Sequence, residues 1–211
     1  KMIEFSKSTR QDNLDKMAKD TLDLLIIGGG ITGAGVALQA AASGIKTGLI
    51  EMQDFSEGTS SRSTKLVHGG IRYLKTFDVE VVSDTVKERA IVQQIAPHIP
   101  KPDPMLLPIY DDEGPTTFDM FSVKIAMDLY DQLAGVKGTK YENYTLNAKE
   151  VLEREPYIKK EGLQGAGVYL DFRNNDARLV IENIKQAAAD GAYLASKVKA
   201  TGFLYKDNKI I

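Results

Sequence analysis

The segment from Leu22 to Glu51 constrains the fold more than any other part of the chain. It reads LDLLIIGGGITGAGVALQAAASGIKTGLIE: an apolar run, a glycine-rich turn, a helical stretch, a second apolar run and an acidic residue. A short apolar run such as 24–27, ended by glycines, is typical of a parallel strand that is buried on both faces. The order therefore predicts a strand–turn–helix–strand unit in a parallel α/β sheet.

The three glycines of the pattern GxGxxG have separate predicted roles. Gly28 permits the tight turn, and Gly30 lets the backbone approach a pyrophosphate. Gly33 lets the helix predicted over 31–43 pack closely against the preceding strand. Together they indicate a turn that binds phosphate through its backbone.

The residues that follow the turn complete the predicted dinucleotide site. Ile31 and Thr32 begin the helix, where unpaired N–H groups and the positive end of the helix dipole attract phosphate without a cationic side chain. Glu51 lies eighteen residues after Gly33, followed by Met52, and its carboxylate can accept hydrogen bonds from ribose hydroxyls while repelling a 2′-phosphate. The pattern predicts a dinucleotide other than NADP, and the alternative is a tight αβ turn without a ligand.

Composition excludes several classes of function. The 211 residues are 43% hydrophobic, enough for one core, or for one domain and part of another. A net charge of -2 gives no field that attracts nucleic acid. The absence of cysteine excludes disulfides and thiolate metal sites, and we expect no metal. The lack of cysteine also suits the cytosol, so we expect a cytoplasmic protein. No apolar run approaches the roughly twenty residues needed to cross a bilayer, and membrane-surface contact is left open.

Periodicity and turn residues predict the remaining elements. The segment 4–20 reads as a short polar helix, an appendage with Ser6 or Ser8 as its N-cap. An Asp207-Asn208 turn precedes what reads as the start of another strand, so we interpret the chain as the N-terminal portion of a longer protein. Further helices are predicted over 78–96, 118–133, 148–155 and 177–190, and strands over 105–110, 167–172 and within 193–205.

A second segment, 58–74, is unusually polar for a connection. It contains five Ser or Thr, two Arg, one Lys and one of the two histidines. Hydroxyl and amide groups of this kind can hold pyrophosphate and sugar oxygens, Gly69 and Gly70 can let a flat ring approach the backbone, and Arg72 can bind an anionic substrate. A solvated loop with a glycine turn is the alternative, since the same residue types are common in loops.

Four stretches carry a resemblance to a known family: GGGITGAG, IEMQDFSEGTSSRSTKLVHGGIRYL, VSDTVKERAIVQQIAPHIPKP and YLDFRNNDARLVIENI. They resemble the FAD-dependent glycerol-3-phosphate dehydrogenase and oxidase family, and the oxidase branch is the most similar. The resemblance implies an α/β fold: a three-layer, glutathione-reductase-like Rossmann FAD-binding domain with part of a substrate domain of the amino-acid-oxidase type. With the polar helix at 1–20, we expect the FAD-binding domain over 21–100 and 171–211, and the partial substrate domain over 101–170.

The resemblance also implies which residues contact FAD. Gly28, Gly30, Gly33 and Glu51 would hold the adenosine and pyrophosphate, and Val198 would offer its backbone to the adenine. For Val198 the alternative is a buried strand residue. The residues that would line the ribityl and flavin side are Thr59, Ser60, Ser61, Ser63, Thr64 and Lys65.

Three further residues match the family's substrate pocket. Arg72 suits a phosphate and Tyr73 a substrate oxygen, the alternatives being a surface arginine and a core tyrosine. His68 is the candidate base that accepts the hydroxyl proton; without the resemblance it would be a bystander. His98 is assigned no role, and the charged residues of VKERAIVQQ are interpreted as a solvated helix face.

The segment around Asp171 is interpreted as structural. Asp171, Arg173 and Asp176 are expected to form ion pairs or, for Asp176, to cap the helix that starts at Ala177.

The reaction that the resemblance implies is oxidation of sn-glycerol 3-phosphate to dihydroxyacetone phosphate, with FAD as cofactor and dioxygen as acceptor, giving hydrogen peroxide. One alternative is a quinone-linked, membrane-associated dehydrogenase. Another is an inactive fragment that binds FAD or NAD. Homo-oligomerisation stays open.

Overall fold

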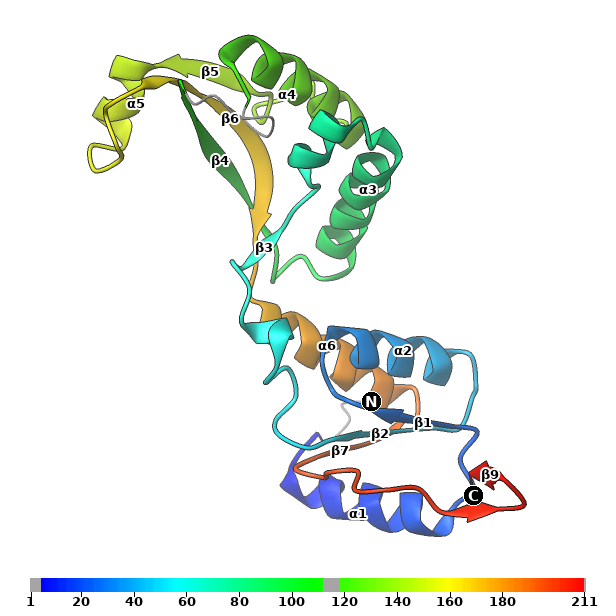
Figure 1. Ribbon diagram of the computed structural model, residues 1–211. Helices are drawn as coiled ribbons and strands as arrows, with labels where there is room; N and C mark the ends of the chain where they lie inside the picture. Colours follow the sequence, from blue (N-terminus) through cyan, green and yellow to red (C-terminus); the bar gives the residue numbers. More distant parts are fainter. Residues whose placement is uncertain (1–4, 112–117, 211) are drawn as a thin grey trace. The chain divides into compact units, whose positions relative to one another are not determined.

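The computed structural model describes residues 5–111 and 118–210, and the chain divides into two compact units (Figure 1). The first comprises Lys1–Lys65 and Asn175–Ile211, and the second Leu66–Asn174. The sequence placed these boundaries after 100 and after 170. They lie elsewhere because strand β3 (Leu66–Val67) pairs with the second unit's sheet and helix α3 (Val79–Ile95) packs in its core.

The first unit is a parallel sheet between two layers of helices (Figure 1). Helices α2 and α6 cover one face, and α1 lies on the other. The prediction of a three-layer α/β fold is confirmed. The strands, in sheet order, are β1 (Leu24–Ile27), β2 (Thr47–Glu51) and β7 (Tyr193–Ser196); the helices are α1 (Lys7–Lys19), α2 (Ile31–Ala42) and α6 (Asp176–Ala189).

Small residues on α2 determine how closely the two covering helices approach. Ala34, Ala37 and Ala41 face Val180 and Ile184 of α6, and all five side chains are buried. Alanine side chains let the two helix backbones come close together and bury their apolar stripes against the sheet. The core of the first unit therefore lies directly beneath the glycine-rich turn that starts α2.

Strand β1 is not buried on both faces, which corrects the prediction. Ile26 packs against the core, but Leu25 is 47% exposed and Ile27 is 52% exposed. Burial alternates along β1 because α2 covers one face of the strand, whereas α1 packs mainly against β7. Leu25 and Ile27 therefore lie on the face of β1 that α2 does not cover.

Helix α1 is part of the sheet's packing, not an appendage as predicted. Ser6 is its N-cap, as the sequence indicated. The Arg10 Nε donates to the Ser196 carbonyl at 2.7 Å, and the Asn13 Nδ2 donates to the Leu194 carbonyl at 3.0 Å. Beyond its last turn, Asp20 forms an ion pair with Lys46 at 3.0 Å.

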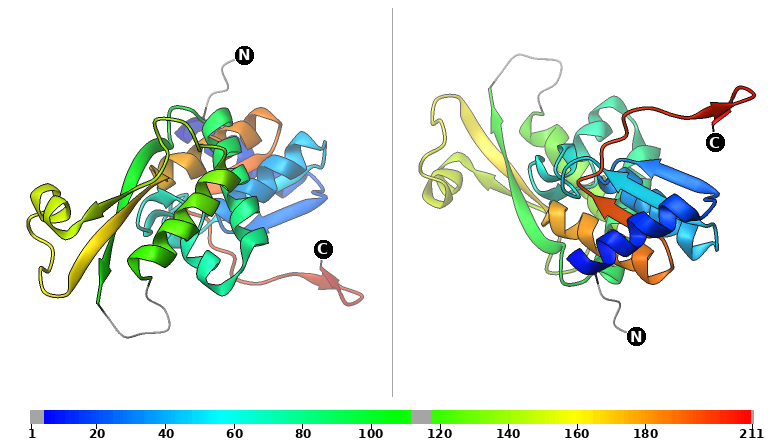
Figure 2. Two further views of the ribbon diagram at one scale, coloured as in Figure 1. Left: turned by 90° about the horizontal axis from the view of Figure 1, so that it is seen from above. Right: turned by 90° about the horizontal axis from the view of Figure 1, so that it is seen from below.

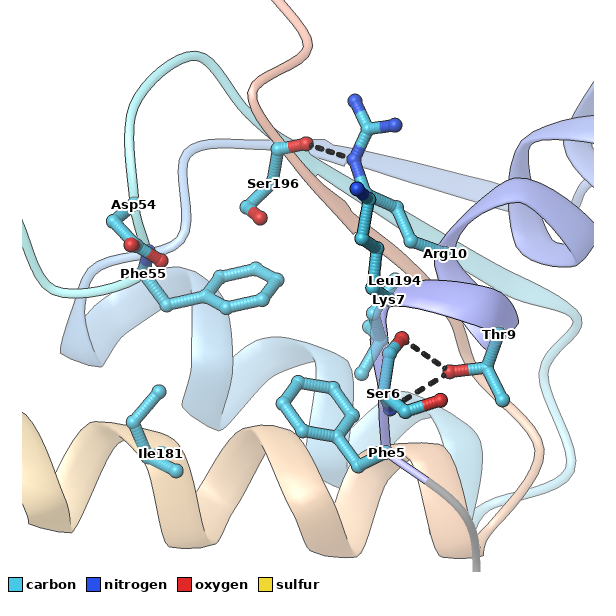
Figure 3. Close-up of a pocket in the computed structure, with 10 residues that line it drawn as sticks. All are labelled: Phe5, Ser6, Lys7, Thr9, Arg10, Asp54, Phe55, Ile181, Leu194 and Ser196. Carbon is cyan, nitrogen blue, oxygen red and sulfur yellow. Dashed lines mark hydrogen bonds between the residues drawn. The ribbon is translucent and has the colours of Figure 1, made fainter.

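A cavity of about 350 Å³ lies where the start of α1 meets the loop after β2 and the end of β7 (Figure 3). The rings of Phe5 and Phe55 approach to 6.1 Å between centroids at its edge. Arg10 closes the opposite side through its bond to Ser196 (Figure 3). None of the predicted site residues lines this cavity, so we interpret it as a packing gap beside α1.

The second unit is built on one long antiparallel strand, β6 (Leu163–Arg173). Strand β4 (Lys101–Tyr110) runs along one side of it, as both views of Figure 2 show. The other side pairs with β3 at one end and with β5 (Tyr144–Asn147) at the other. Strand β4 holds three prolines, which is compatible with a ladder because it is an edge strand.

Successive side chains of β4 belong to two separate hydrophobic clusters. Leu107 and Ile109 pack with α3 and α4 (Met120–Ala134), whereas Leu106 packs with α5 (Ala148–Arg154). Since neighbouring strand residues point to opposite faces, α4 and α5 cover opposite faces of this sheet.

The predicted helices and strands are found, with ends shifted by a few residues. The Asp207-Asn208 turn is also confirmed: both residues have positive φ, 50° and 59°, and join β8 (Tyr205–Lys206) to β9 (Lys209–Ile210) as a two-residue hairpin. Two short 3₁₀ helices complete the chain, η1 (Thr59–Ser61) and η2 (Ile71–Thr76). Among the described helices, none is long and apolar enough to span a membrane.

Candidate functional site

The glycine-rich turn between β1 and α2 has the geometry that its sequence requires. Gly28 adopts φ +114°, a conformation that other residues rarely take. A Cβ on Gly33 would lie 1.9 Å from the Gly28 carbonyl oxygen, so any side chain there would force the helix away from the turn. Gly30 is the N-cap of α2, and its backbone is extended.

The start of α2 leaves backbone donors for a ligand. The Ile31 N–H donates to the Ser60 hydroxyl at 2.9 Å, and the Ala34 N–H donates to the Gly30 carbonyl at 2.9 Å. The N–H groups of Thr32 and Gly33 between them have no hydrogen bond within the described chain. They are the unpaired donors expected in the first turn of a helix, where an anion can bind without help from a cationic side chain.

Glu51 is oriented by the backbone on both sides of it. One carboxylate oxygen accepts from the Gly29 N–H and the other from the Gln53 N–H, both at 2.7 Å. An ionised carboxylate has about four lone-pair sites, so two remain for the hydroxyls of a ribose. The neighbouring Met52 is 58% exposed.

Val198 lies beside Glu51 but beyond the end of β7, so it is not the buried strand residue of the alternative interpretation. Its N–H donates to the Glu51 carbonyl at 2.8 Å. The preceding Lys197 has φ 59°, and its N–H donates to the Gln53 carbonyl at 2.9 Å. The backbone at 197–198 is therefore fixed next to the acid that ends β2.

The polar loop after β2 is partly attached to the glycine turn and partly to α6. Ser60 contacts the start of α2 through the bond from Ile31. Ser63 and Lys65 both interact with Asp176, and the Lys65 ammonium also donates to the Ser61 carbonyl. Thr59 and Thr64 are exposed. The structure thus brings Ser60 to the predicted phosphate site, and the flavin-side roles of the loop stay predictions.

Asp176 is paired, as the sequence indicated, but it is not the helix cap. The cap of α6 is Asn175, whose side-chain oxygen accepts from the Arg178 N–H at 3.1 Å, and Asp176 is the first helical residue. The cap falls one residue earlier because an asparagine stands there that can fulfil the same role.

The second group of predicted site residues lies in the second unit, where β3 leads into η2. His68 and Arg72 are exposed, and Tyr73 is half-buried. The Arg72 guanidinium donates to the Tyr73 hydroxyl at 3.3 Å and lies 5.1 Å from the centre of its ring. The pair therefore presents a cation and a phenol at one place on the surface, as an anionic, hydroxylated ligand requires.

The two glycines after His68 are needed for internal packing. A Cβ on Gly69 would lie 2.3 Å from the Tyr130 hydroxyl, and one on Gly70, which has φ +68°, would lie 2.7 Å from the Tyr73 ring. The space that a side chain would need at each position is already filled by one of the chain's own tyrosines.

Arg89 is a buried charged residue that the sequence did not lead us to expect. It was interpreted as part of a solvated helix face, yet only 3% of it is exposed. Its Nη1 lies 2.6 Å from an Asp171 carboxylate oxygen, which confirms the predicted ion pairing of Asp171. Val82, Val86 and Arg89 are the buried residues of α3, spaced by four and three. That helical spacing places Arg89 on the apolar stripe, and it was the signal available in the sequence.

Arg173 forms the other predicted ion pair, with Asp103 at 3.5 Å, and both side chains are well exposed. His98 is exposed, and no role is assigned to it. Among the described residues there is no cluster of three or more histidine, aspartate or glutamate side chains that could hold a metal ion.

The parallel sheet, the glycine turn with two unpaired helix N–H groups, and the acid that ends β2 define a dinucleotide-binding α/β protein. A family model supports a narrower assignment: the FAD dependent oxidoreductase (DAO) model matches residues 23–210. The chain belongs to this family of FAD-dependent oxidoreductases.

Individual relatives are highly similar over nearly the whole chain. An alpha-glycerophosphate oxidase of Lactococcus lactis subsp. lactis is 73% identical over 209 residues, 99% of this chain and 34% of the relative. An alpha-glycerophosphate oxidase of Enterococcus casseliflavus is 72% identical, with the same coverage. The chain thus spans about a third of the length of these relatives.

Solved structures agree with this assignment. The glycerol-3-phosphate dehydrogenase from Bacillus halodurans complexed with FAD is 41% identical, with a TM-score of 0.71 over 99% of this chain and 33% of that one. A glycine oxidase from Bacillus cereus, 21% identical with a TM-score of 0.58, covers 90% of this chain and 51% of its own and shares the fold.

Proposed function

We propose that the full-length protein oxidises sn-glycerol 3-phosphate to dihydroxyacetone phosphate, using FAD, with dioxygen as the final acceptor and hydrogen peroxide as product. The observation that carries this proposal is 72–73% identity, across nearly the whole chain, to proteins named alpha-glycerophosphate oxidase. The proposal places the protein in the cytoplasm.

The residues of the first unit fit the adenosine and pyrophosphate of FAD. The N–H groups of Thr32 and Gly33 and the positive end of the α2 dipole would hold the phosphates. The free lone pairs of Glu51 would accept from the ribose hydroxyls, and the backbone at Val198 would face the adenine. We assign the first unit to FAD binding and the second to part of the substrate domain.

The residues of the second unit fit the substrate. Arg72 would bind the phosphate through its guanidinium, and Tyr73 would donate to a substrate oxygen. His68 would accept the hydroxyl proton at the carbon that is oxidised. FAD, when bound, supplies the acceptor for the hydrogen that leaves that carbon with its electron pair.

Anaerobic reduction of the flavin tests the substrate. The full-length protein should show a flavin band in visible light that bleaches when sn-glycerol 3-phosphate is added without oxygen. Intact FAD that does not bleach would overturn the substrate assignment. A colourless protein that binds NAD would overturn the cofactor assignment.

Oxygen consumption then separates the two acceptors. Stoichiometric hydrogen peroxide from the reduced enzyme supports the oxidase. Reoxidation by a quinone, with negligible oxygen uptake and peripheral membrane contact, would favour the dehydrogenase alternative.

A further inference from the structure

A buried polar network surrounds the turn that follows His68. The Tyr130 hydroxyl donates to an Asp171 carboxylate oxygen at 2.8 Å and accepts from the Arg89 Nη1 at 2.9 Å. Arg89 and Asp171 are each 3% exposed in their side chains, and Tyr130 is completely buried. Arg89 also donates to the Leu170 carbonyl at 3.0 Å. Three elements, α3, α4 and β6, thus contribute one side chain each to a single cluster.

The cluster holds the backbone of Gly69 directly. The Gly69 N–H donates to the Tyr130 hydroxyl at 2.9 Å and to Asp171 at 3.1 Å. On the opposite side, the Thr85 hydroxyl lies 2.8 Å from the Gly69 carbonyl and 2.8 Å from the Val81 carbonyl of its own helix, so the two carbonyls share its one proton. Because peptide groups are planar, these bonds fix two successive planes, the one joining His68 to Gly69 and the one joining Gly69 to Gly70.

The position of the turn determines where the proposed site residues lie. The β3–β6 ladder ends at Val67, so His68 stands one residue beyond its last backbone pair. Gly70 is the N-cap of η2, the short helix that carries Arg72 and Tyr73. His68 therefore comes directly before the fixed peptide groups, and Arg72 follows two residues after Gly70, within η2.

Tyr130 is suited to this task because it remains a neutral donor. Burial raises the pKa of its phenol well above the usual value, and the neighbouring Asp171 carboxylate adds to the rise. Its hydroxyl therefore keeps its proton, so that it can donate to Asp171 while it accepts from Gly69 and Arg89.

We propose that Arg89, Tyr130 and Asp171 are positioning residues for glycerol 3-phosphate oxidation, because they fix the His68–Gly69–Gly70 backbone and thereby align His68 with Arg72. This inference rests on the proposed function. None of the three needs to contact the substrate, and each acts through the peptide groups of Gly69.

Two mild substitutions in the full-length flavoprotein test the inference. Tyr130→Phe removes one acceptor of the Gly69 N–H and keeps the ring. Tyr169→Phe is the matched control, because Tyr169 packs edge-on against Tyr130 at 5.6 Å and has no hydrogen bond to Gly69. Thr85→Val removes the donor to the Gly69 carbonyl, and it keeps the test valid if Tyr130→Phe does not fold.

The readout is the anaerobic rate constant for flavin reduction per bound FAD, at saturating glycerol 3-phosphate. We expect about a tenfold or greater decrease in Tyr130→Phe and a smaller one in Thr85→Val, since a misplaced base slows the chemical step. Tyr169→Phe should match the wild type. A purely structural role would lower the folded fraction and the flavin content but would leave the rate per flavin unchanged.

The outcomes distinguish this inference from the function on which it rests. If the wild type is reduced and Tyr130→Phe and Thr85→Val both match Tyr169→Phe, the positioning role is overturned and the function stands. If the wild-type flavin is not reduced at all, the function is overturned and the inference falls with it.

Discussion

The two glycine-containing turns of this chain are stabilised in different ways. The turn before α2 is held almost entirely by backbone: Gly28 adopts a positive φ, Gly33 allows close approach, and the ligand donors are N–H groups. The turn after His68 is held by side chains that come from three other elements and meet in a buried ion pair. The side chains that bond the first turn are 22 and 29 positions away in the sequence, whereas the second turn depends on a residue 102 positions away.

Removal of the buried carboxylate that holds the second turn should cause the largest loss of stability. Asp171→Ala leaves the Arg89 guanidinium buried without its partner, and we expect a loss of about 3–5 kcal/mol in the free energy of unfolding. Urea denaturation followed by circular dichroism measures it. Asp103→Ala is the control, because its ion pair with Arg173 is exposed and should contribute about 0–1 kcal/mol. Equal losses in the two variants would show that burial of the pair is unimportant.

The backbone-built turn should be most sensitive to an added methyl group. Gly33→Ala places a Cβ 1.9 Å from the Gly28 carbonyl oxygen, and we expect a loss of about 1–3 kcal/mol together with weaker FAD binding. Gly35→Ala, in the same helix, meets no atom within 4 Å and should stabilise the helix by up to about 1 kcal/mol. Denaturation and flavin titration test both variants, and similar behaviour of the two would contradict the close-packing role of Gly33.

Glu51 tests the first turn because it is the charged one of two side chains, with Ser60, that accept hydrogen bonds from the backbone of that turn. Glu51→Gln removes the charge that accepts from Gly29 and Gln53, and we expect FAD affinity to fall about tenfold, the equivalent of one charge-assisted hydrogen bond. Flavin fluorescence gives the dissociation constant. Glu57→Gln, a change of the same charge on the exposed loop nearby, should leave it unaltered; a tenfold loss in this control would point to a general effect of charge.

The smallest expected effect concerns the attachment of α1. Hydrogen bonds from Lys46 and then Tyr193 lower the pKa of Asp20. A lowered carboxyl pKa contributes stability that is present above the unfolded value of about 4 and is lost as the pH falls through the folded value. Asp20→Asn should therefore flatten the acid side of the stability profile slightly, in thermal melts between about pH 2 and 6. Asp12→Asn, on the same helix and without an ion pair in the described chain, is the control, and an equal change there would contradict the assignment.

The difference between the two turns, local backbone against distant side chains, also explains how much of the structure the sequence could predict. The strand–turn–helix unit, the Asp207-Asn208 hairpin and the ends of most helices follow from local patterns, which the structure confirms. The burial of Arg89, the domain boundary after Lys65 and the role of α1 do not, because each depends on a long-range contact. Local chemistry was sufficient where the backbone forms the site, and it failed where distant side chains meet.

The unpaired N–H groups of Thr32 and Gly33 have one more consequence. Main-chain amides neither gain nor lose protons in ordinary buffers, unlike histidine side chains, whose usual pKa is about 6.5. The affinity of this helix end for a diphosphate should therefore be the same in mildly acidic and mildly alkaline solution. Any change in coenzyme retention across that range would have to originate at ionisable side chains elsewhere in the molecule.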